Sequence, residues 1–355
     1  MDRVRPANPR LAGIEPYDPS YVAADVMLSA NENTRNLPPE VMAQIQARLS
    51  SLDFNRYPDP LANRLRALIA KANGLTRQQV LIGNGGDELL FNTLLAWGGE
   101  GRTLLNVPPT FSIYELYAQI TGTSVVNVPR RADLTVDEEA VLARASQPDI
   151  DLVIITSPNN PSGDVVDPAF VERLLNVTDA LVLIDEAYQE FSGQTVLPLL
   201  EHHKNLMILH TFSKAYSLAG ARVGYIFADP SVIDEFLKVR QPYSVNALSQ
   251  LVAEVVFENR AALMPGVDQI VSERARLIEE LPRIKGVTVR PSSANYVLIH
   301  VPDAHRVWER LLAEHSVLVR DFSRTPGLED CLRLSVGQPD EDTRLLDALR
   351  QVVEG

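Results

Sequence analysis

The sequence is poor in cysteine, in long apolar runs and in basic charge, and each shortage excludes a class of protein. Cys331 is the only cysteine, so the chain cannot form an internal disulfide and a reducing compartment is expected. No apolar run approaches the ~20 residues that a membrane-spanning helix needs. The N-terminal stretch MDRVRPANPR also lacks the apolar centre of a signal peptide. We therefore expect a cytoplasmic protein without a membrane partner.

The charge balance is acidic, with a formal net charge of −13 at pH 7. Such a chain would repel nucleic acid, so no nucleic-acid partner is expected. An anionic ligand would have to be held by a few locally placed cations. Cys331 lies in the strand-like stretch CLRLSV and is interpreted as a small core residue.

The order of apolar patterns predicts an α/β fold with one large and one smaller domain. Helical spacing is found at 39–50, 61–73 and 87–97, with Gly74 as a stop for the second of these helices. Continuous apolar runs are typical of strands buried on both faces of a mainly parallel sheet. Such runs, of strand type, recur at 79–83, 103–107, 124–128, 152–156, 180–184, 205–209 and 223–227.

The pattern changes after about residue 245. Two helices (246–258 and 267–281) are followed by short strand-like stretches and by helices at 303–315 and 339–353. This order predicts a separate α+β unit. The expected division is an irregular, proline-rich N-terminal arm (1–25), a large domain with a parallel central sheet flanked by helices (26–245) and a small C-terminal domain (246–355).

Polar residues follow three of the predicted strands, and a glycine-rich turn follows a fourth. Asn160 comes after LVIIT, Asp185 ends the run ALVLID, and Lys214 follows NLMILH within TFSK. Functional residues in an open α/β sheet gather beyond the carboxyl ends of its strands. Taken singly, Asp185 suits a helix N-cap, Asn160 a turn and Lys214 a solvated surface. Together with a glycine-rich turn after QVLI, they favour one functional site.

The glycine-rich turn GNGG (83–86) indicates an anion site. It differs from the dinucleotide motif G-x-G-x-x-G because Asp87 and Glu88 follow directly, and no G-K-[ST] of a P-loop follows. Glycines between a strand and a helix let main-chain N–H groups approach a phosphate. Ser213 and Arg222 could complete such a site.

These stretches, in this order, resemble the fold-type I pyridoxal-phosphate (PLP) aminotransferases, and among them the histidinol-phosphate aminotransferase family. The resemblance runs from IEPY (14–17) to CLRLSVGQP (331–339). Its motifs are NEN (31–33), RYPDP (56–60), GNGGDEL (83–89), PPTFSIY (108–114), PNNPSG (158–163), DEAYQEF (185–191), TFSKAYSLAGARVGY (211–225) and VRDFS (319–323).

The resemblance implies a catalytic group around PLP. Lys214 resembles the lysine that forms a Schiff base with the cofactor and then moves the substrate α-proton. Asp185 resembles the partner of the pyridine nitrogen, and Asn160 and Tyr188 resemble the pair that hydrogen-bonds the phenolic oxygen. A phosphate cup is implied at Gly86, the main chain of Asp87, Ser213 and Arg222.

Two aromatic residues carry further implications of the resemblance. Phe111 matches the aromatic that stacks on the cofactor ring, although an ordinary core position also suits a phenylalanine. Tyr57 matches a tyrosine that reaches the phosphate of a neighbouring subunit, so a homodimer with shared sites is implied.

The resemblance also suggests how substrate is held. Arg333 resembles the arginine that clamps the α-carboxylate, although an arginine in a strand could pair with a structural acid. Arg320 is a candidate for a distal phosphate, or it could pair with Asp321. Asn33 is expected at the substrate entrance. There the chain departs from the family, because Thr34, Arg35 and Asn36 replace its usual Pro-aromatic-Gly, which leaves the substrate open.

Three functions remain compatible with the sequence. The first is transamination between histidinol phosphate and 2-oxoglutarate in histidine biosynthesis. The second is a related PLP activity, namely aromatic-amino-acid transamination or threonine-phosphate decarboxylation. The third, a PLP-sensing regulator, would need a DNA-binding extension, and the arm (1–25) is too short and too poor in helix signal to supply one.

Overall fold

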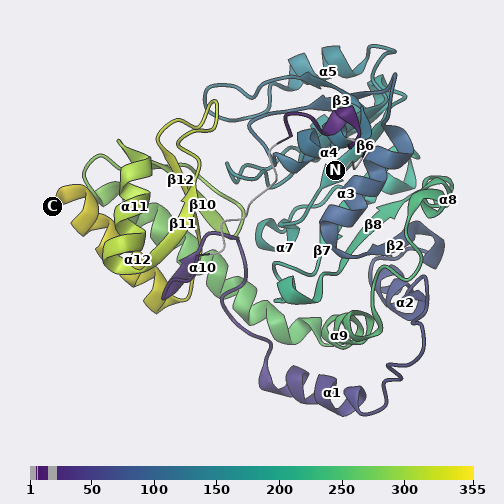
Figure 1. The fold of residues 1–355 in the computed structure, drawn as a ribbon, viewed down its shortest axis with the longest axis horizontal. Coiled ribbons are helices and arrows are strands. Elements are labelled where there is room, and N and C mark those ends of the chain that lie inside the picture. The colour runs from purple at the N-terminus through teal and green to yellow at the C-terminus, as the bar shows by residue number, and fades with distance from the viewer. Residues whose placement is uncertain (1–4, 6, 15–21) are drawn as a thin grey trace.

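The computed structural model describes residues 5, 7–14 and 22–355. Nearly half of the predicted arm and most of the IEPY motif therefore lie outside the described residues. Figure 1 shows a larger part on the right built around one sheet and a smaller part on the left, which carries the C-terminus. Within the described residues, no helix is both long enough and apolar enough to cross a membrane.

The larger part is built on a seven-stranded sheet that is mainly parallel, as the apolar runs predicted. Only the pairs that involve β8 are antiparallel. Because β8 is antiparallel to both of its neighbours, β2 runs in the same direction as β7. In spatial order, the strands are β2 (Val80–Gly83), β8 (Gly224–Ala228), β7 (Leu206–Thr211), β6 (Leu181–Asp185), β5 (Leu152–Thr156), β3 (Thr103–Asn106) and β4 (Ser124–Asn127).

Helices cover both faces of this sheet, and the helical patterns at 39–50, 61–73 and 87–97 are confirmed within a few residues. Gly74, with φ of +69°, follows the second of them and provides the expected stop. The helices of this part are α1 (Pro39–Leu49), α2 (Asn63–Ala72), α3 (Gly85–Trp97), α4 (Ile113–Thr121), α5 (Glu138–Ala145), α6 (Pro168–Val177), α7 (Gln189–Ser192), α8 (Pro230–Val239) and α9 (Ala247–Glu258). Short 3₁₀ turns are η1 (Pro9–Leu11), η2 (Arg77–Gln79), η3 (Leu197–Glu201) and η4 (Ala219–Ala221).

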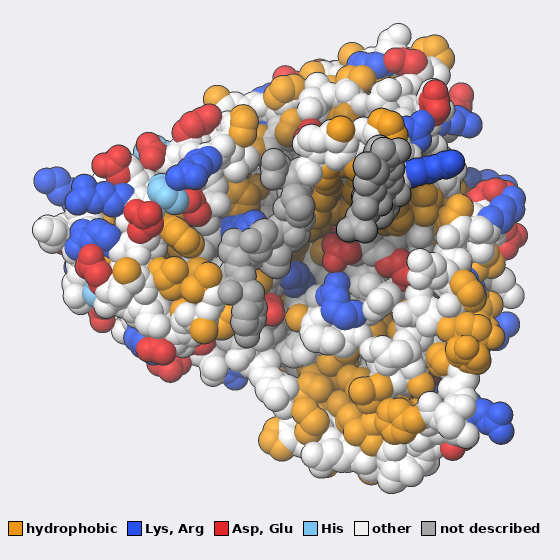
Figure 2. Space-filling view, viewed as in Figure 1, with side chains coloured by type: hydrophobic (Ala, Val, Ile, Leu, Met, Phe, Trp, Pro, Cys, Tyr) orange, Lys and Arg blue, Asp and Glu red, His pale blue; other side chains and the backbone are white. Residues whose placement is uncertain are grey.

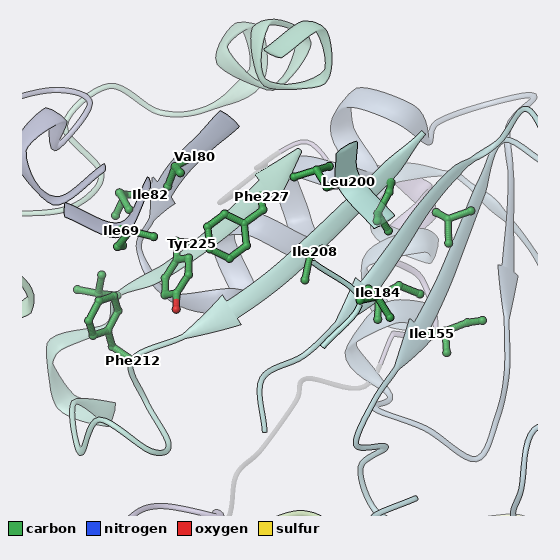
Figure 3. Close-up of a cluster of buried hydrophobic side chains, with 14 of the residues drawn as sticks. Ile69, Val80, Ile82, Ile155, Ile184, Leu200, Ile208, Phe212, Tyr225 and Phe227 are labelled. Carbon is green, nitrogen blue, oxygen red and sulfur yellow. The ribbon is translucent and has the colours of Figure 1, made fainter. Parts of the chain in front are cut away.

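The two faces of the sheet bury two separate apolar clusters. Along β6, Val182 and Ile184 pack into one cluster, whereas Leu181 and Leu183 pack into the other. This alternation follows from the period of two in a strand, and it explains the continuous apolar runs. Figure 3 shows the first cluster, where Tyr225 and Phe227 of β8 lie on the same face as Ile208 of β7.

The smaller part has a five-stranded sheet with the order β1-β11-β12-β10-β9. Its first strand comes from far away in the sequence, because β1 pairs in parallel with β11 through Val26 and Val317. The strands are β1 (Val26–Leu28), β9 (Thr288–Val289), β10 (Tyr296–His300), β11 (Val317–Asp321) and β12 (Cys331–Ser335). The expected α+β unit is thus present, joined by an N-terminal strand that the sequence did not indicate.

Three long helices pack on the small sheet and agree with the predicted ranges within three residues. α10 leads from the larger part toward it (Figure 1). These helices are α10 (Met264–Glu280), α11 (Ala304–His315) and α12 (Pro339–Glu354), with the 3₁₀ turns η5 (Arg260–Leu263) and η6 (Leu281–Arg283) at the ends of α10. Cys331 is buried, as expected. The boundaries at 25 and 245 remain a prediction, although α9, which follows residue 245, packs on α1 and α2 of the larger part, and β1, which follows residue 25, joins the small sheet.

Candidate active site

The polar residues that follow β5, β6, β7 and β2 lie at one edge of the central sheet. The four strands run in the same direction, and Thr156 at the end of β5 is the register partner of Asp185 at the end of β6. Their carboxyl ends therefore meet on one side of the molecule. Figure 2 shows this face hollowed between the two parts, with basic and acidic side chains gathered in the hollow.

Lys214 is held as an amine in this site and is not a solvated surface charge. Its Nζ donates a hydrogen bond to the carbonyl oxygen of Ala30 at 2.9 Å and lies 5.9 Å from the ring centre of Tyr188. Burial lowers the pKa of Lys214 to about 8, helped by the nearby Arg333 cation and opposed by Glu32. A lysine in this state is partly neutral near physiological pH, as a carbonyl-reactive amine needs to be.

Asp185 is buried with two neutral hydrogen-bond donors. Its Oδ2 accepts from the hydroxyl of Tyr114 at 2.6 Å, and its Oδ1 accepts from the main-chain N–H of Ala187 at 3.0 Å. Burial raises the pKa of Asp185 to about 6, although these two hydrogen bonds act in the opposite direction. Among the described residues no cation forms an ion pair with this carboxylate, so a positively charged ligand group would be stabilised here.

The glycine-rich turn forms a close-fitting cradle with Arg222. The guanidinium of Arg222 contacts Asp87 Oδ2 at 3.0 Å and Ser213 Oγ at 3.4 Å. A Cβ placed on Gly85, which has φ of +82°, would lie only 2.6 Å from Arg222 Nη2. Gly86 has no such constraint, since its Cβ would meet only Leu209 at 3.4 Å. The requirement for glycine is thus strongest one residue before the predicted position.

The N-terminus of α3 faces this cradle with its N–H groups. The side chain of the N-cap residue Asn84 makes no hydrogen bond to the first turn, and Glu88 Oε2 accepts from the main-chain N–H of Asn84 itself. The first turn of a helix has N–H groups without intrahelical acceptors, and its dipole favours an anion. With Ser213 and Arg222 beside it, the turn fits a phosphate group, and the predicted cup residues are brought together.

Asn160 is hydrogen-bonded to β12, and Tyr188 is hydrogen-bonded to the segment that follows β1. Asn160 Oδ1 accepts a hydrogen bond from Arg333 Nη1 at 2.5 Å. The hydroxyl of Tyr188 accepts from Asn31 Nδ2 at 3.0 Å. Asn31 is buried with φ of 55° and is further held by Ser335. Two loops of the larger part and the small sheet therefore meet at this site.

Arg333 and Arg320 lie opposite each other on β12 and β11. They are register partners in an antiparallel pair, so their side chains project from the same face of the sheet. Arg333 also donates to the carbonyl oxygen of Ser29 at 2.5 Å, and its guanidinium lies 5.5 Å from the ring centre of Phe322. Asp321, the alternative partner proposed for Arg320, is hydrogen-bonded to His305 Nδ1 at 2.7 Å.

Three further predicted residues lie at the margins of the site. Phe111 is half-buried and packs edge-on against Tyr114, with ring centres 5.7 Å apart. Asn33 accepts a hydrogen bond from the main chain of Arg35 at 3.0 Å. Tyr57 is 82% exposed and stacks on Tyr243 at 4.6 Å. None of these contacts joins the three residues to Lys214.

Sequence reasoning missed Tyr114, Asn31 and Gly85 as individual residues of the site. Tyr114 lies in an amphipathic helix, where an aromatic residue is normally interpreted as part of the hydrophobic core. Asn31 and Gly85 belong to the motifs NEN and GNGG, which supplied the signal without identifying the residue. In the structure both residues have a positive φ, a backbone conformation that Asn and Gly adopt more easily than other residues.

Comparison with known proteins agrees with this arrangement over the full chain. The family described as "Aminotransferase class I and II" matches residues 24–349. Histidinol-phosphate aminotransferase 1 of Carboxydothermus hydrogenoformans is 36% identical over 353 residues, which cover 99% of this chain and 100% of that protein.

Solved structures share the fold. Histidinol-phosphate aminotransferase from Sinorhizobium meliloti, in complex with pyridoxal-5'-phosphate, superposes with a TM-score of 0.90 at 24% identity, over 100% of this chain and 99% of that one. L-threonine-O-3-phosphate decarboxylase from Porphyromonas gingivalis gives a TM-score of 0.82 at 26% identity, over 93% and 100% of the two chains. The fold is therefore compatible with more than one substrate.

Proposed function

The chain belongs to the aminotransferase class I and II family, and on that premise we propose that it uses PLP to transfer the amino group of histidinol phosphate to 2-oxoglutarate. The observation that carries the proposal is the meeting of Lys214, Asp185 and the Arg222 cradle at one sheet edge. The full-length likeness to a histidinol-phosphate aminotransferase supports the substrate pair. The expected place of this activity is histidine biosynthesis in the cytoplasm.

The residues present fit PLP group by group. The N-terminus of α3, Ser213 and Arg222 suit its phosphate. The buried Asp185 carboxylate, which has no cation as a hydrogen-bond partner among the described residues, suits a protonated pyridine nitrogen. Asn160 and Tyr188 would hold its phenolic oxygen, and Phe111 would lie against its ring. When bound, PLP supplies an electron-accepting ring for the pair left by the departing α-proton.

Lys214 would act both as the nucleophile and as the group that transfers the α-proton. Its Nζ can attack a carbonyl when neutral, and a pKa of about 8 keeps a neutral fraction available near pH 7.5. The same Nζ can accept a proton from the substrate α-carbon and return it later. Asp185 holds a fixed negative charge, and the hydrogen bonds from Tyr114 and Ala187 keep its carboxylate in place.

The two arginines of the small sheet would bind the anionic end of either substrate. Histidinol phosphate carries a phosphate ester on the carbon that is a carboxylate in an amino acid. The same site must therefore accept a phosphate in one half-reaction and a carboxylate in the other, which revises the assignment of Arg333 to the carboxylate alone. Two guanidiniums on facing register positions suit both groups.

A substrate screen tests the proposal. Purified protein with PLP and 2-oxoglutarate should release glutamate fastest with histidinol phosphate, compared with phenylalanine, tyrosine and threonine phosphate. Arg320→Ala should lower kcat/KM for histidinol phosphate by about 10–100-fold, the size of a charge-assisted hydrogen bond, and lower it less for phenylalanine, which carries one charge there. A preference for phenylalanine, or release of CO₂ from threonine phosphate, would replace the proposed substrate.

A homodimer with shared sites forms part of the same proposal. The exposed large apolar side chains include Phe54 (74% exposed), Tyr57, Tyr243 and Leu248. Figure 2 shows a broad apolar area at the lower end of the face drawn, a feature that commonly marks a protein interface. Tyr57 would then meet the cofactor phosphate of the partner subunit.

Subunit mixing tests the dimer. Lys214→Ala and Tyr57→Ala proteins should each have low activity, and after verified subunit exchange the mixed dimers should regain activity, because one of the two sites is intact. Absence of recovery would show that Tyr57 acts within its own chain or has only a structural role.

A further inference from the structure

Tyr114 is a buried aromatic residue that the proposed chemistry has not yet used. It lies on α4, its side chain is 1% exposed, and its hydroxyl oxygen lies 2.6 Å from Asp185 Oδ2 and 2.8 Å from Thr156 Oγ1. A tyrosine in an apolar core needs a partner for its hydroxyl. Here that partner is the carboxylate assigned to the cofactor.

The direction of each hydrogen bond follows from the number of hydrogens. An ionised carboxylate only accepts, so the single hydrogen of Tyr114 goes to Asp185. The hydroxyl of Thr156 must then donate to the oxygen of Tyr114. Burial, and next the charge of Asp185, raise the pKa of Tyr114 well above its ordinary value of 10.0, so the phenol stays protonated and remains a donor.

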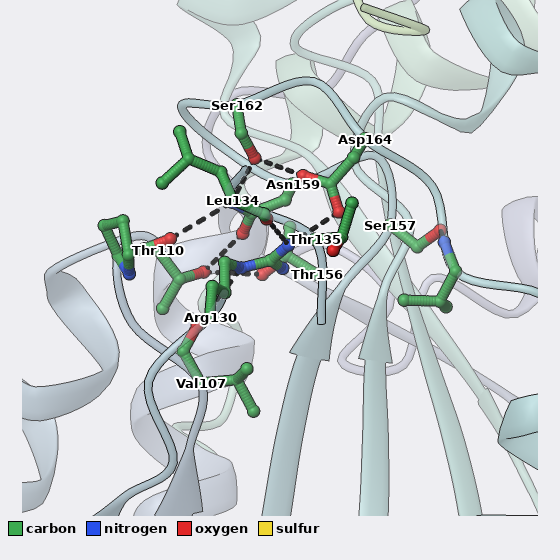
Figure 4. Close-up of polar contacts among 12 residues, drawn as sticks. Val107, Thr110, Arg130, Leu134, Thr135, Thr156, Ser157, Asn159, Ser162 and Asp164 are labelled. Carbon is green, nitrogen blue, oxygen red and sulfur yellow. Dashed lines mark hydrogen bonds and ion pairs between the residues drawn. The ribbon is translucent and has the colours of Figure 1, made fainter. Parts of the chain in front are cut away.

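The same chain of contacts is anchored in the loop that carries Asn160. Thr110 donates to Asn159 Oδ1 at 2.7 Å, and Asn159 Nδ2 donates to Ser162 Oγ at 2.7 Å. Asp164 binds Ser162 and the buried guanidinium of Arg130, as Figure 4 shows. Since Thr110 lies 3.2 Å from Thr156, the Tyr114 hydroxyl sits at the end of a packed polar cluster with little freedom to move.

We propose that Tyr114 is a positioning residue that keeps Asp185 ionised and oriented toward the pyridine nitrogen of the cofactor. Two neutral donors, Tyr114 and the Ala187 N–H, occupy one lone pair on each carboxylate oxygen and fix its plane. A donor to a carboxylate stabilises the anion. Without Tyr114, Asp185 takes up a proton at higher pH and loses its partnership with the ring. This inference rests on the proposed use of PLP.

The test measures cofactor binding without turnover. Pyridoxamine 5'-phosphate cannot bond covalently to Lys214, so its Kd for the apoprotein between pH 5 and pH 9 reports the non-covalent contacts. Tyr114→Phe should weaken binding at pH 7 by about tenfold, the size of one charge-assisted hydrogen bond, and should move the acidic midpoint of the binding curve to higher pH.

Two variants control the measurement. Tyr225→Phe, which removes a hydroxyl that contacts His210 on the other face of the sheet, should leave Kd and midpoint unchanged. Thr156→Val leaves Tyr114 in the core but removes the hydroxyl that donates to the Tyr114 oxygen. This variant should also move the acidic midpoint to higher pH, by a smaller amount than Tyr114→Phe. If Tyr114→Phe does not fold, the shift of the midpoint in Thr156→Val tests the proposal in its place.

The outcomes separate this inference from the function it rests on. One outcome is that the wild-type protein binds pyridoxamine 5'-phosphate normally and that neither Tyr114→Phe nor Thr156→Val shifts the midpoint. This result would overturn the role of Tyr114 and leave the PLP proposal standing. Failure of the wild-type protein to bind pyridoxamine 5'-phosphate at any pH would overturn both.

Discussion

Asp185 and Glu186 are consecutive buried carboxylates on opposite faces of the central sheet, and their surroundings differ. Glu186, 2% exposed, accepts hydrogen bonds from His210 Nε2 at 2.8 Å, from Thr195 Oγ1 at 2.7 Å and from the Val196 N–H at 2.7 Å. Asp185, 5% exposed, has only the neutral donors Tyr114 and Ala187 among the described residues.

The difference separates a structural acid from a functional one. Burial alone would lower the pKa of His210, but the hydrogen bond and charge of Glu186, followed by the charges of Glu190 and Asp185, outweigh it and raise that pKa. Glu186 thus has a cationic partner, His210, within the protein. Its hydrogen bonds to Thr195 and Val196 also hold the segment 186–196, which carries Tyr188, in place. No cation among the described residues forms an ion pair with Asp185. Burial raises its pKa although the more distant His210 charge acts in the opposite direction, so its ionised form is unfavourable in the apoprotein and a cationic ligand would relieve it.

The largest expected contrast is in turnover. Asp185→Asn keeps the shape of the side chain but removes its charge, and we expect kcat for glutamate formation to fall on the order of 10²–10³-fold, the size found when one preorganised electrostatic partner is lost. Glu186→Gln, its matched control, should change kcat of the folded protein only a few-fold. An equal loss in the two variants would contradict the division of roles.

Stability should show the reverse contrast. Glu186→Gln leaves His210 without its buried anion, and removing one partner of a buried pair costs about 3–5 kcal/mol, less if the imidazole gives up its proton. Asp185→Asn should leave the apoprotein as stable as the wild type or more so. Urea unfolding of both apoproteins, compared by midpoint at unchanged m-value, measures the difference.

The two carboxylates should also act in different pH windows. The pKa of Asp185 rises from 3.8 to about 6 on folding, so the native apoprotein binds more protons and its stability falls as the pH rises between these values, by at most about 3 kcal/mol. The raised pKa of His210 gives stability that is present below pH 6.5 and lost as the pH rises through the folded pKa. The buried carboxyls of Glu190 and Asp342, whose pKa values burial raises to about 7, contribute to the same fall in stability. Asp185→Asn should therefore reduce the first window without removing it, and a pH series of unfolding midpoints with an unchanged slope between pH 4 and pH 6 would contradict this account.

The smallest effect is expected at the tyrosine on the Glu186 side. Tyr225 contacts His210 Nδ1 at 3.3 Å, a long hydrogen bond between groups that do not touch Asp185. Tyr225→Phe should lower the free energy of unfolding by about 0.5–1.5 kcal/mol and leave cofactor affinity unchanged, unlike Tyr114→Phe. A loss of affinity in this variant would show that the two faces are coupled.

Much of the fold could be predicted because buried positions are occupied by apolar residues, which gives each element a recognisable sequence pattern. Strands covered on both faces gave continuous apolar runs, and the polar residue after each run indicated Asn160, Asp185 and Lys214. β1 was missed because three residues carry too little pattern, and its pairing with β11 depends on residues almost 300 positions away. Glycine positions were predicted to within one residue, since only the positive φ of Gly85 and its contact with Arg222 distinguish it from Gly86.

The partners of Asp185 and Glu186 could not be predicted from the sequence. Both acids follow the same apolar run, and nothing local distinguishes them. Strand alternation places them on opposite faces, but Tyr114 lies 71 residues from Asp185, and His210 lies 24 residues from Glu186. Only the packing of α4 on one face and the pairing of β6 with β7 bring these groups together.

The most direct test of the central claim is to identify the lysine that PLP modifies. The other lysines, Lys71, Lys204, Lys238 and Lys285, are exposed, whereas Lys214 is partly buried with a pKa lowered to about 8. Protein saturated with PLP, reduced with borohydride and digested for mass spectrometry should carry the cofactor on Lys214, and Lys214→Ala should carry none. Modification spread over the exposed lysines, or an unmodified Lys214, would contradict the account.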